Sequence, residues 1–182
     1  MKNLIYIFLV IFCHFGCETK CDKKEISKTV KVPETIIAKT PISNNPTLIN
    51  SLIDSALFQG NERAYNRVAS YYLLESRGQE FFYYAFTMAN KYNSAEASYH
   101  VYDIIAYSTP EDPKEALMKM DNGTKNFALF YLLKSYEAGF ESAKYAVHEI
   151  FGKDSIPKSS FYLREFVNYS LHAPENPTRK KR

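Results

Sequence analysis

The sequence predicts an all-α fold: three stacked helix-turn-helix repeats, which together make a short α-solenoid, followed by a C-terminal capping helix. From residue 46 onward, apolar side chains recur every three or four residues, which places them on one face of a helix. The chain of 182 residues contains only 6 Gly and 8 Pro, few for a β-rich protein with many tight turns. Glycine and proline also divide the apolar segments into pairs, which is typical of helical hairpins.

Residues with known capping or breaking roles bound the expected helices. Asn45 and Pro46 can start the first helix, and Gly60 can end it, because glycine readily adopts the left-handed conformation of a helix C-terminus. Gly78 separates the second helix from the third, and Ser94 can cap the fourth. The expected helices span residues 46–57, 61–72, 80–92, 95–107, 113–118, 125–138, 141–151 and 157–168.

The chain begins with the features of a secretory signal. One lysine precedes an apolar run at residues 4–13, which at 1.5 Å per residue spans only about half of a hydrocarbon core of roughly 30 Å. An uncleaved amphiphilic anchor is the alternative, and it would also place the protein at a membrane. We therefore predict a signal peptide at 1–16, a flexible tether at 17–45, the helical repeat domain at 46–172 and a basic tail at 173–182.

Cys17 is the predicted site of lipid attachment. Gly16 and Cys17 resemble the end of a bacterial lipoprotein signal, where a small residue precedes the lipidated cysteine, although His14 and Phe15 depart from the usual pattern. A lipid such as palmitate on Cys17 would anchor the protein at the cell envelope. Removal of the signal would leave Cys21 as the only other thiol, so we expect no internal disulfide and no metal site.

Composition and motifs argue against several classes of function. Residues 46–172 hold 12 Lys and Arg against 15 Asp and Glu, and this acidic balance argues against a nucleic-acid partner. The chain lacks a glycine-rich phosphate loop, a Gly-x-Ser-x-Gly elbow and a zinc-binding motif, so we expect no cofactor and no enzyme activity. His100 and His148 are the candidates for a catalytic residue, but a lone histidine on a helix is far more often structural.

A self-similar pattern occurs three times in the expected helices. In each copy, a turn residue is followed at steps of four by a small residue and then two larger apolar residues. The small residue would let the two helices of a hairpin approach closely, and the larger ones would pack against the next hairpin. The three copies are Gly60, Ala64, Val68 and Tyr72; Asn93, Ala97, Val101 and Ile105; and Gly139, Ala143, Val147 and Phe151.

The third copy resembles a known repeat family. Residues 128–131 (Ala-Leu-Phe-Tyr) and 135–139 (Ser-Tyr-Glu-Ala-Gly), followed by Ala143 and Tyr145, are similar to the Sel-type (suppressor-of-lin-like) repeat, a relative of the tetratricopeptide repeat. The resemblance extends over residues 47–152, with Phe82 at a position where the family prefers alanine. It implies stacked helical hairpins that bind another protein on their concave side.

The resemblance also implies which residues face a partner. First-helix residues outside the packing positions would line the concave side, where tyrosine offers a large contact and methionine an adaptable one. Tyr84 and Phe130 have an alternative role, since they can equally seal the seam between hairpins. By register, the expected partner-binding residues are Tyr84, Met88, Lys91, Phe130, Lys134 and Glu137.

These observations predict a membrane-tethered, non-enzymatic scaffold that binds a protein partner at the bacterial cell envelope. An envelope immunity protein that binds and blocks a toxin is the alternative, because a small, anchored, rigid surface would serve that purpose. A hydrolase with an unrecognised site is the third hypothesis. An irregular helical bundle is the alternative architecture.

Overall fold

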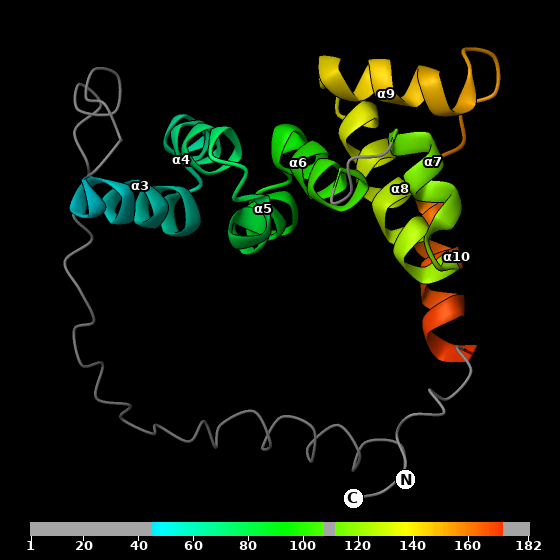
Figure 1. Cartoon of the computed structure of the whole chain (residues 1–182), viewed down its shortest axis with the longest axis horizontal. Coiled ribbons are helices and arrows are strands. Elements are labelled where there is room, and N and C mark those ends of the chain that lie inside the picture. The colour runs from blue at the N-terminus through cyan, green and yellow to red at the C-terminus, as the bar shows by residue number, and fades with distance from the viewer. Residues whose placement is uncertain (1–44, 108–111, 173–182) are drawn as a thin grey trace, which may run out of the picture. The chain divides into compact units, whose positions relative to one another are not determined.

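The computed structural model describes residues 45–107 and 112–172, and all regular secondary structure in these ranges is helical (Figure 1). The predicted all-α class is therefore confirmed for the described part of the chain. The predicted signal peptide, tether and basic tail lie outside the described residues, apart from Asn45. The helices are α3 (Pro46–Gln59), α4 (Glu62–Leu74), α5 (Gly78–Lys91), α6 (Ala95–Ala106), α7 (Pro113–Lys119), α8 (Asn122–Glu137), α9 (Glu141–Phe151) and α10 (Ser159–His172).

Side-chain caps determine where several of these helices begin. Asn45 and Ser94 each accept a hydrogen bond from the backbone N–H three residues later, at 3.0 and 3.2 Å, as their sequence positions predict. α8 begins at Asn122, earlier than the predicted start at residue 125. The reason is the Asp121 side chain, which accepts a hydrogen bond from the Thr124 backbone N–H at 3.0 Å and so caps the helix.

Three of the turns between consecutive helices share one backbone geometry. Gly60, Asn93 and Gly139, the turn residues of the self-similar pattern, have positive φ angles of 67°, 54° and 86°. The alanine four residues after each of them is fully buried. The left-handed turn ends one helix, and a side chain as small as alanine allows a neighbouring helix to approach the next one closely.

Consecutive helices pack in pairs, and neighbouring pairs also contact one another. α3 packs against α4, α5 against α6, and α8 against α9. α5 also contacts α3 and α4, while α6 and α10 both pack against α8 (Figure 1). Buried residues from these helices form one hydrophobic cluster, in which Tyr65, Phe81 and Tyr102 are among the largest fully buried side chains.

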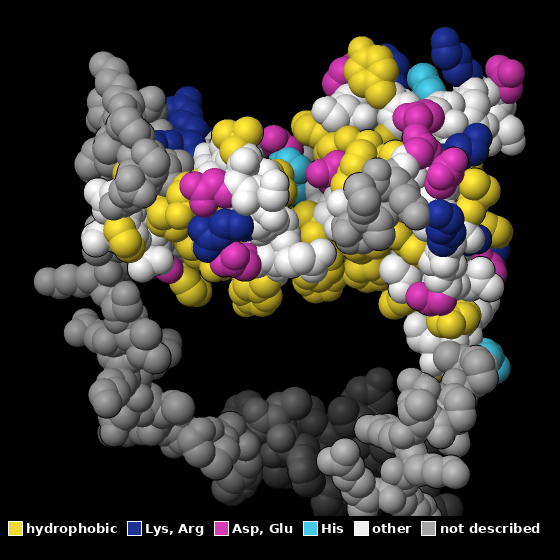
Figure 2. All heavy atoms as spheres, in the orientation of Figure 1, with side chains coloured by type: hydrophobic (Ala, Val, Ile, Leu, Met, Phe, Trp, Pro, Cys, Tyr) yellow, Lys and Arg dark blue, Asp and Glu magenta, His cyan; other side chains and the backbone are white. Residues whose placement is uncertain are grey.

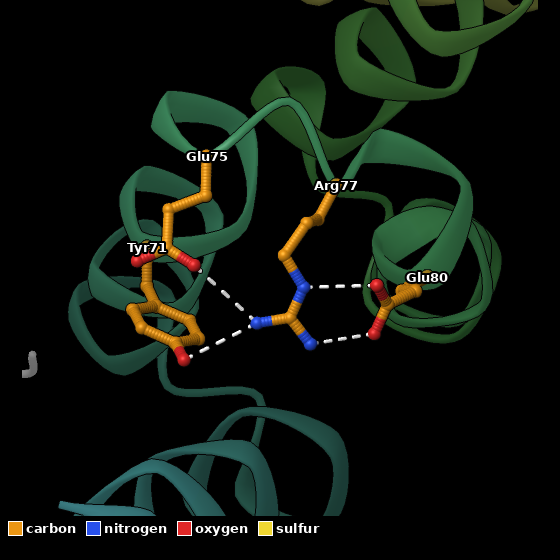
Figure 3. A network of polar contacts seen from close by, with 4 residues as sticks. All are labelled: Tyr71, Glu75, Arg77 and Glu80. Atoms are coloured by element: carbon orange, nitrogen blue, oxygen red, sulfur yellow. Dashed lines mark hydrogen bonds and ion pairs between the residues drawn. The ribbon is translucent and has the colours of Figure 1, made fainter. Parts of the chain in front are cut away.

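Arg77 connects α4 to α5 across the turn between them (Figure 3). Its guanidinium donates two hydrogen bonds to the Glu80 carboxylate, at 2.8 and 2.6 Å, and one to the Tyr71 hydroxyl at 3.2 Å. Glu75 accepts a fourth, at 3.4 Å, and the guanidinium lies 4.8 Å from the centre of the Tyr72 ring. These contacts hold the turn in place at the start of α5, which has no side-chain N-cap.

We expect Ala143→Leu to destabilise the domain by about 1–3 kcal/mol, because added methylene groups at a fully buried position force its neighbours apart. Urea unfolding followed by far-UV circular dichroism measures the free energy. Ser142→Leu, at an exposed position one residue earlier in α9, is the matched control and should change it by less than about 0.5 kcal/mol. Equal stability of Ala143→Leu and the wild type would contradict close packing at this position.

Candidate protein-binding surface

The six residues predicted to face a partner lie in different environments. Met88 is 0% exposed and belongs to the hydrophobic core. The prediction that it faces a partner is therefore wrong. The reason is that Met88 shares the buried face of α5 with Phe81, Ala85 and Ala89, and α5 contacts α3, α4 and α6. Tyr84 and Phe130 are half-buried against the core, whereas Lys91 and Glu137 are exposed.

Lys91 and Lys134 connect neighbouring helices of the stack. The Lys91 ammonium donates a hydrogen bond to the carbonyl of Leu57 in the last turn of α3, at 2.9 Å. The Lys134 ammonium on α8 donates to the carbonyl of Ala89 in the last turn of α5, at 2.6 Å, and burial lowers the pKa of this lysine. The last carbonyls of a helix lack intrahelical partners and carry partial negative charge, so an ammonium group there is favourable. Both lysines therefore make contacts within the protein.

Glu137 attaches the start of α10 to the end of α8. Its Oε1 accepts a hydrogen bond from the Ser159 backbone N–H at 2.9 Å, and its Oε2 accepts one from the Ser159 hydroxyl at 2.6 Å. The first N–H groups of a helix have no intrahelical partner and lie at its positive dipole end, so a carboxylate stabilises them. Glu137 thus acts as a helix cap supplied by another helix.

A group of aromatic side chains remains partly exposed on α3, α5 and α8. Phe58 is 66% exposed, Tyr83 65% and Phe86 37%. The Phe86 ring contacts those of Phe82 on the same helix and Phe127 on α8, with ring centres 6.0 and 6.3 Å apart. Figure 2 shows hydrophobic side chains gathered along the lower edge of these helices. We name Phe58, Phe82, Tyr83, Phe86 and Phe127 the aromatic face.

The aromatic face combines a large contact area with limited flexibility. Phenylalanine and tyrosine lose little side-chain entropy on binding, and the stacked rings of Phe82, Phe86 and Phe127 support one another. Asn90 supports Phe86 further, because its side-chain amide donates hydrogen bonds to the Phe86 carbonyl at 2.8 Å and to the Tyr131 hydroxyl at 2.7 Å. Clustered, exposed aromatic residues on a rigid support are typical of protein-binding surfaces.

The repeat register in the sequence predicts a partner contact at Tyr84 but not at Phe58, Phe86 or Phe127. The sequence does contain a pattern that indicates part of this surface. Residues 82, 86 and 90 are spaced by four and therefore share one side of α5. Residue 127 is on another helix, and its contact with Phe86 depends on how α8 packs, which the spacing within one helix does not encode.

His100 is enclosed by aromatic rings in the core. Its Nδ1 lies 2.8 Å from the Tyr65 hydroxyl, and its ring centre is 5.9 Å from that of Phe81. Burial lowers the pKa of His100 to about 4, so the imidazole is neutral at pH 7. His148, the other histidine considered as a catalyst, lies on α9 against the Tyr136 ring, 6.3 Å between centres. The two histidines belong to separate parts of the packing.

Asp103 carries a half-buried carboxyl group beside a small cavity of about 350 Å³, which Gly78 and Tyr107 also line. Burial raises the pKa of Asp103 to about 6. Its side chain makes no hydrogen bond or ion pair with another described residue. Across residues 45–107 and 112–172, no group of His, Cys, Asp and Glu side chains is arranged to hold a metal ion.

No family model, curated protein or solved structure matches this chain. None of the helices in the described ranges has the length and hydrophobicity needed to cross a lipid bilayer. Cys17 lies outside the described residues.

We expect Asp103→Asn to raise the free energy of unfolding by about 1–3 kcal/mol at about pH 8, since the buried carboxylate is then ionised at a cost. The carboxyl ionises near pH 3.8 when unfolded and near 6 when folded, so the gain should shrink as the pH falls below 6. Urea titrations across this range measure it, with the exposed Asp154→Asn as control. A gain that is the same at about pH 3.5 would contradict the assignment to ionisation.

Proposed function

We propose that this protein is a non-enzymatic, membrane-tethered scaffold that binds a protein partner through the aromatic face. The observation that carries the proposal is the exposure of Phe58, Tyr83 and Phe86 on helices whose other sides are packed. Phe86 also stacks with Phe82 and Phe127, and large exposed apolar side chains of this kind mark sites that contact another molecule. A lipid on Cys17 would hold the protein at the bacterial cell envelope, with residues 17–45 as the tether.

The helix pairs α3–α4, α5–α6 and α8–α9 are, in this proposal, diverged copies of one repeat, and α10 is the capping helix. Two features support it: the shared positive φ of the turn residue, and the buried alanine four positions later. In such a stack each copy buries its apolar face against its neighbours, and the remaining surface is free for binding. The resemblance to Sel-type repeats points to the same organisation.

Replacing Tyr83 and Phe86 together by serine should abolish partner binding and leave the fold intact, because both side chains are exposed and hot-spot residues of interfaces are commonly aromatic. The tagged full chain is recovered after cross-linking in intact cells, and the bound proteins are compared by mass spectrometry. The matched control replaces Leu74 and Tyr145 by serine, which removes two even more exposed large side chains from α4 and α9. Recovery of the same partner with the Tyr83/Phe86 variant would exclude the aromatic face as its binding site.

Metabolic labelling with a palmitate analogue tests the tether. The wild type and the control Cys21→Ser should both incorporate the label, because each retains Cys17, whereas Cys17→Ser should not. In-gel fluorescence of the immunoprecipitated full chain measures incorporation. Equal labelling of Cys17→Ser and the wild type would disprove lipid attachment at this residue while leaving the binding proposal open to its own test.

A further inference from the structure

A groove of about 630 Å³ lies between α7, α8, the end of α9 and α10. None of the residues of the aromatic face lines it. Its apolar walls come from residues such as Leu129 and Tyr162, and lysine and asparagine side chains also line it. The groove is therefore separate from the aromatic face and differs from it in chemistry.

The wall of the groove that α10 provides is held against α8 at several points. A Cβ atom at Gly123 would lie 2.5 Å from the Tyr169 ring, so the absence of a side chain there is what lets the two helices come this close. The Phe127 and Phe166 rings contact each other with centres 5.1 Å apart. Together with the cap that Glu137 provides, these contacts form the groove before any ligand arrives.

Positive charge is concentrated in this groove. Lys114 on α7 and Lys125 on α8 both line it, and neither ammonium group has a hydrogen bond or ion pair with another described residue. Glu165, the one acidic residue among the described residues that line the groove, already lies 3.4 Å from the Arg164 guanidinium. Since residues 46–172 as a whole carry more acidic than basic groups, two unpaired lysines at one groove are a local exception.

The same groove offers groups that match a peptide backbone. The side chains of Asn122, Asn126 and Asn168 line it and have no hydrogen-bond partner among the described residues. An asparagine amide both donates and accepts hydrogen bonds, as a peptide group does. Met118 and Phe161, which are 68% and 43% exposed, add apolar contact area beside these amides.

We propose that the groove binds an extended acidic segment of a partner protein, with carboxylates at Lys114 and Lys125 and its backbone along the three asparagines. The two lysines favour a negatively charged ligand. The asparagine amides and the apolar walls favour a peptide over a small inorganic anion, because a peptide offers both backbone hydrogen bonds and apolar side chains. A nucleic acid or an anionic membrane fits less well, because both are bound mainly through many basic groups and this groove has only two lysines.

Fluorescence anisotropy of the full chain with a labelled synthetic peptide tests the proposal. The probe is an unstructured peptide of about ten residues in which Asp and Glu alternate with Leu and Phe, and the comparison peptide carries Asn and Gln in place of the acids. We expect the acidic peptide to bind at least about tenfold more tightly than the neutral one, and the difference to shrink with added salt.

Lys114→Glu combined with Lys125→Glu should weaken binding of the acidic peptide by about tenfold or more. The matched control is Lys144→Glu with Lys153→Glu, two exposed lysines that do not line the groove, and it should bind like the wild type. Circular dichroism establishes that both variants are folded. The Tyr83/Phe86 serine variant should also bind the peptide normally. Failure of the groove proposal can therefore be distinguished from failure of the proposal for the aromatic face.

Three outcomes would each overturn the proposal. The first is that the wild type fails to bind the acidic peptide, the second that it binds the acidic and neutral peptides equally, and the third that the Lys114/Lys125 variant binds the acidic peptide as tightly as the wild type. Sedimentation with vesicles of phosphatidylcholine and phosphatidylglycerol tests whether the groove binds an anionic membrane instead. Vesicle binding that depends on Lys114 and Lys125, in the absence of peptide binding, would assign the groove to a membrane surface and also reject the peptide.

Discussion

Isolated helices of 7 to 16 residues, the lengths found here, are marginal in water, so every helix of this domain depends on packing against a neighbour. The fully buried alanines at 64, 97 and 143 make that packing close, because a larger side chain would hold the helices apart. The lysine-to-carbonyl contacts add polar links between α3 and α5 and between α5 and α8. Both the aromatic face and the groove exist only because these contacts fix the helices on which their residues lie.

The abundance of tyrosine, 15 residues against no tryptophan, gives the core a polar as well as an apolar component. Each buried hydroxyl needs a partner, and several find one on another helix. Tyr65 bonds to His100, Tyr131 bonds to Asn90, and the Tyr92 hydroxyl donates to the Leu57 carbonyl at 2.9 Å. These pairs fix the register of neighbouring helices, which apolar packing alone would specify less strictly.

Much of the fold was predictable from local signals. Helix positions follow from apolar spacing and caps such as Ser94, and the left-handed turns follow from Gly60 and Gly139. The binding residues were harder to predict. Met88 is enclosed by three other helices, and Lys134 is drawn to the end of α5, both of which depend on tertiary packing. The groove joins residues 114 and 169, and no local pattern relates positions so far apart in the chain.

α10 differs from the other helices in having no buried residue along its whole length. Its attachment to α8 depends on incompletely buried rings, such as Phe166 and Tyr169, and on the two hydrogen bonds that Ser159 donates to Glu137. Local opening has the lowest free energy where buried apolar contacts are fewest, so this helix should exchange its amide protons before the rest of the domain. Detachment of α10 would remove one wall of the groove while the α3–α6 packing persists, so groove occupancy and the ordering of the final helix are thermodynamically coupled.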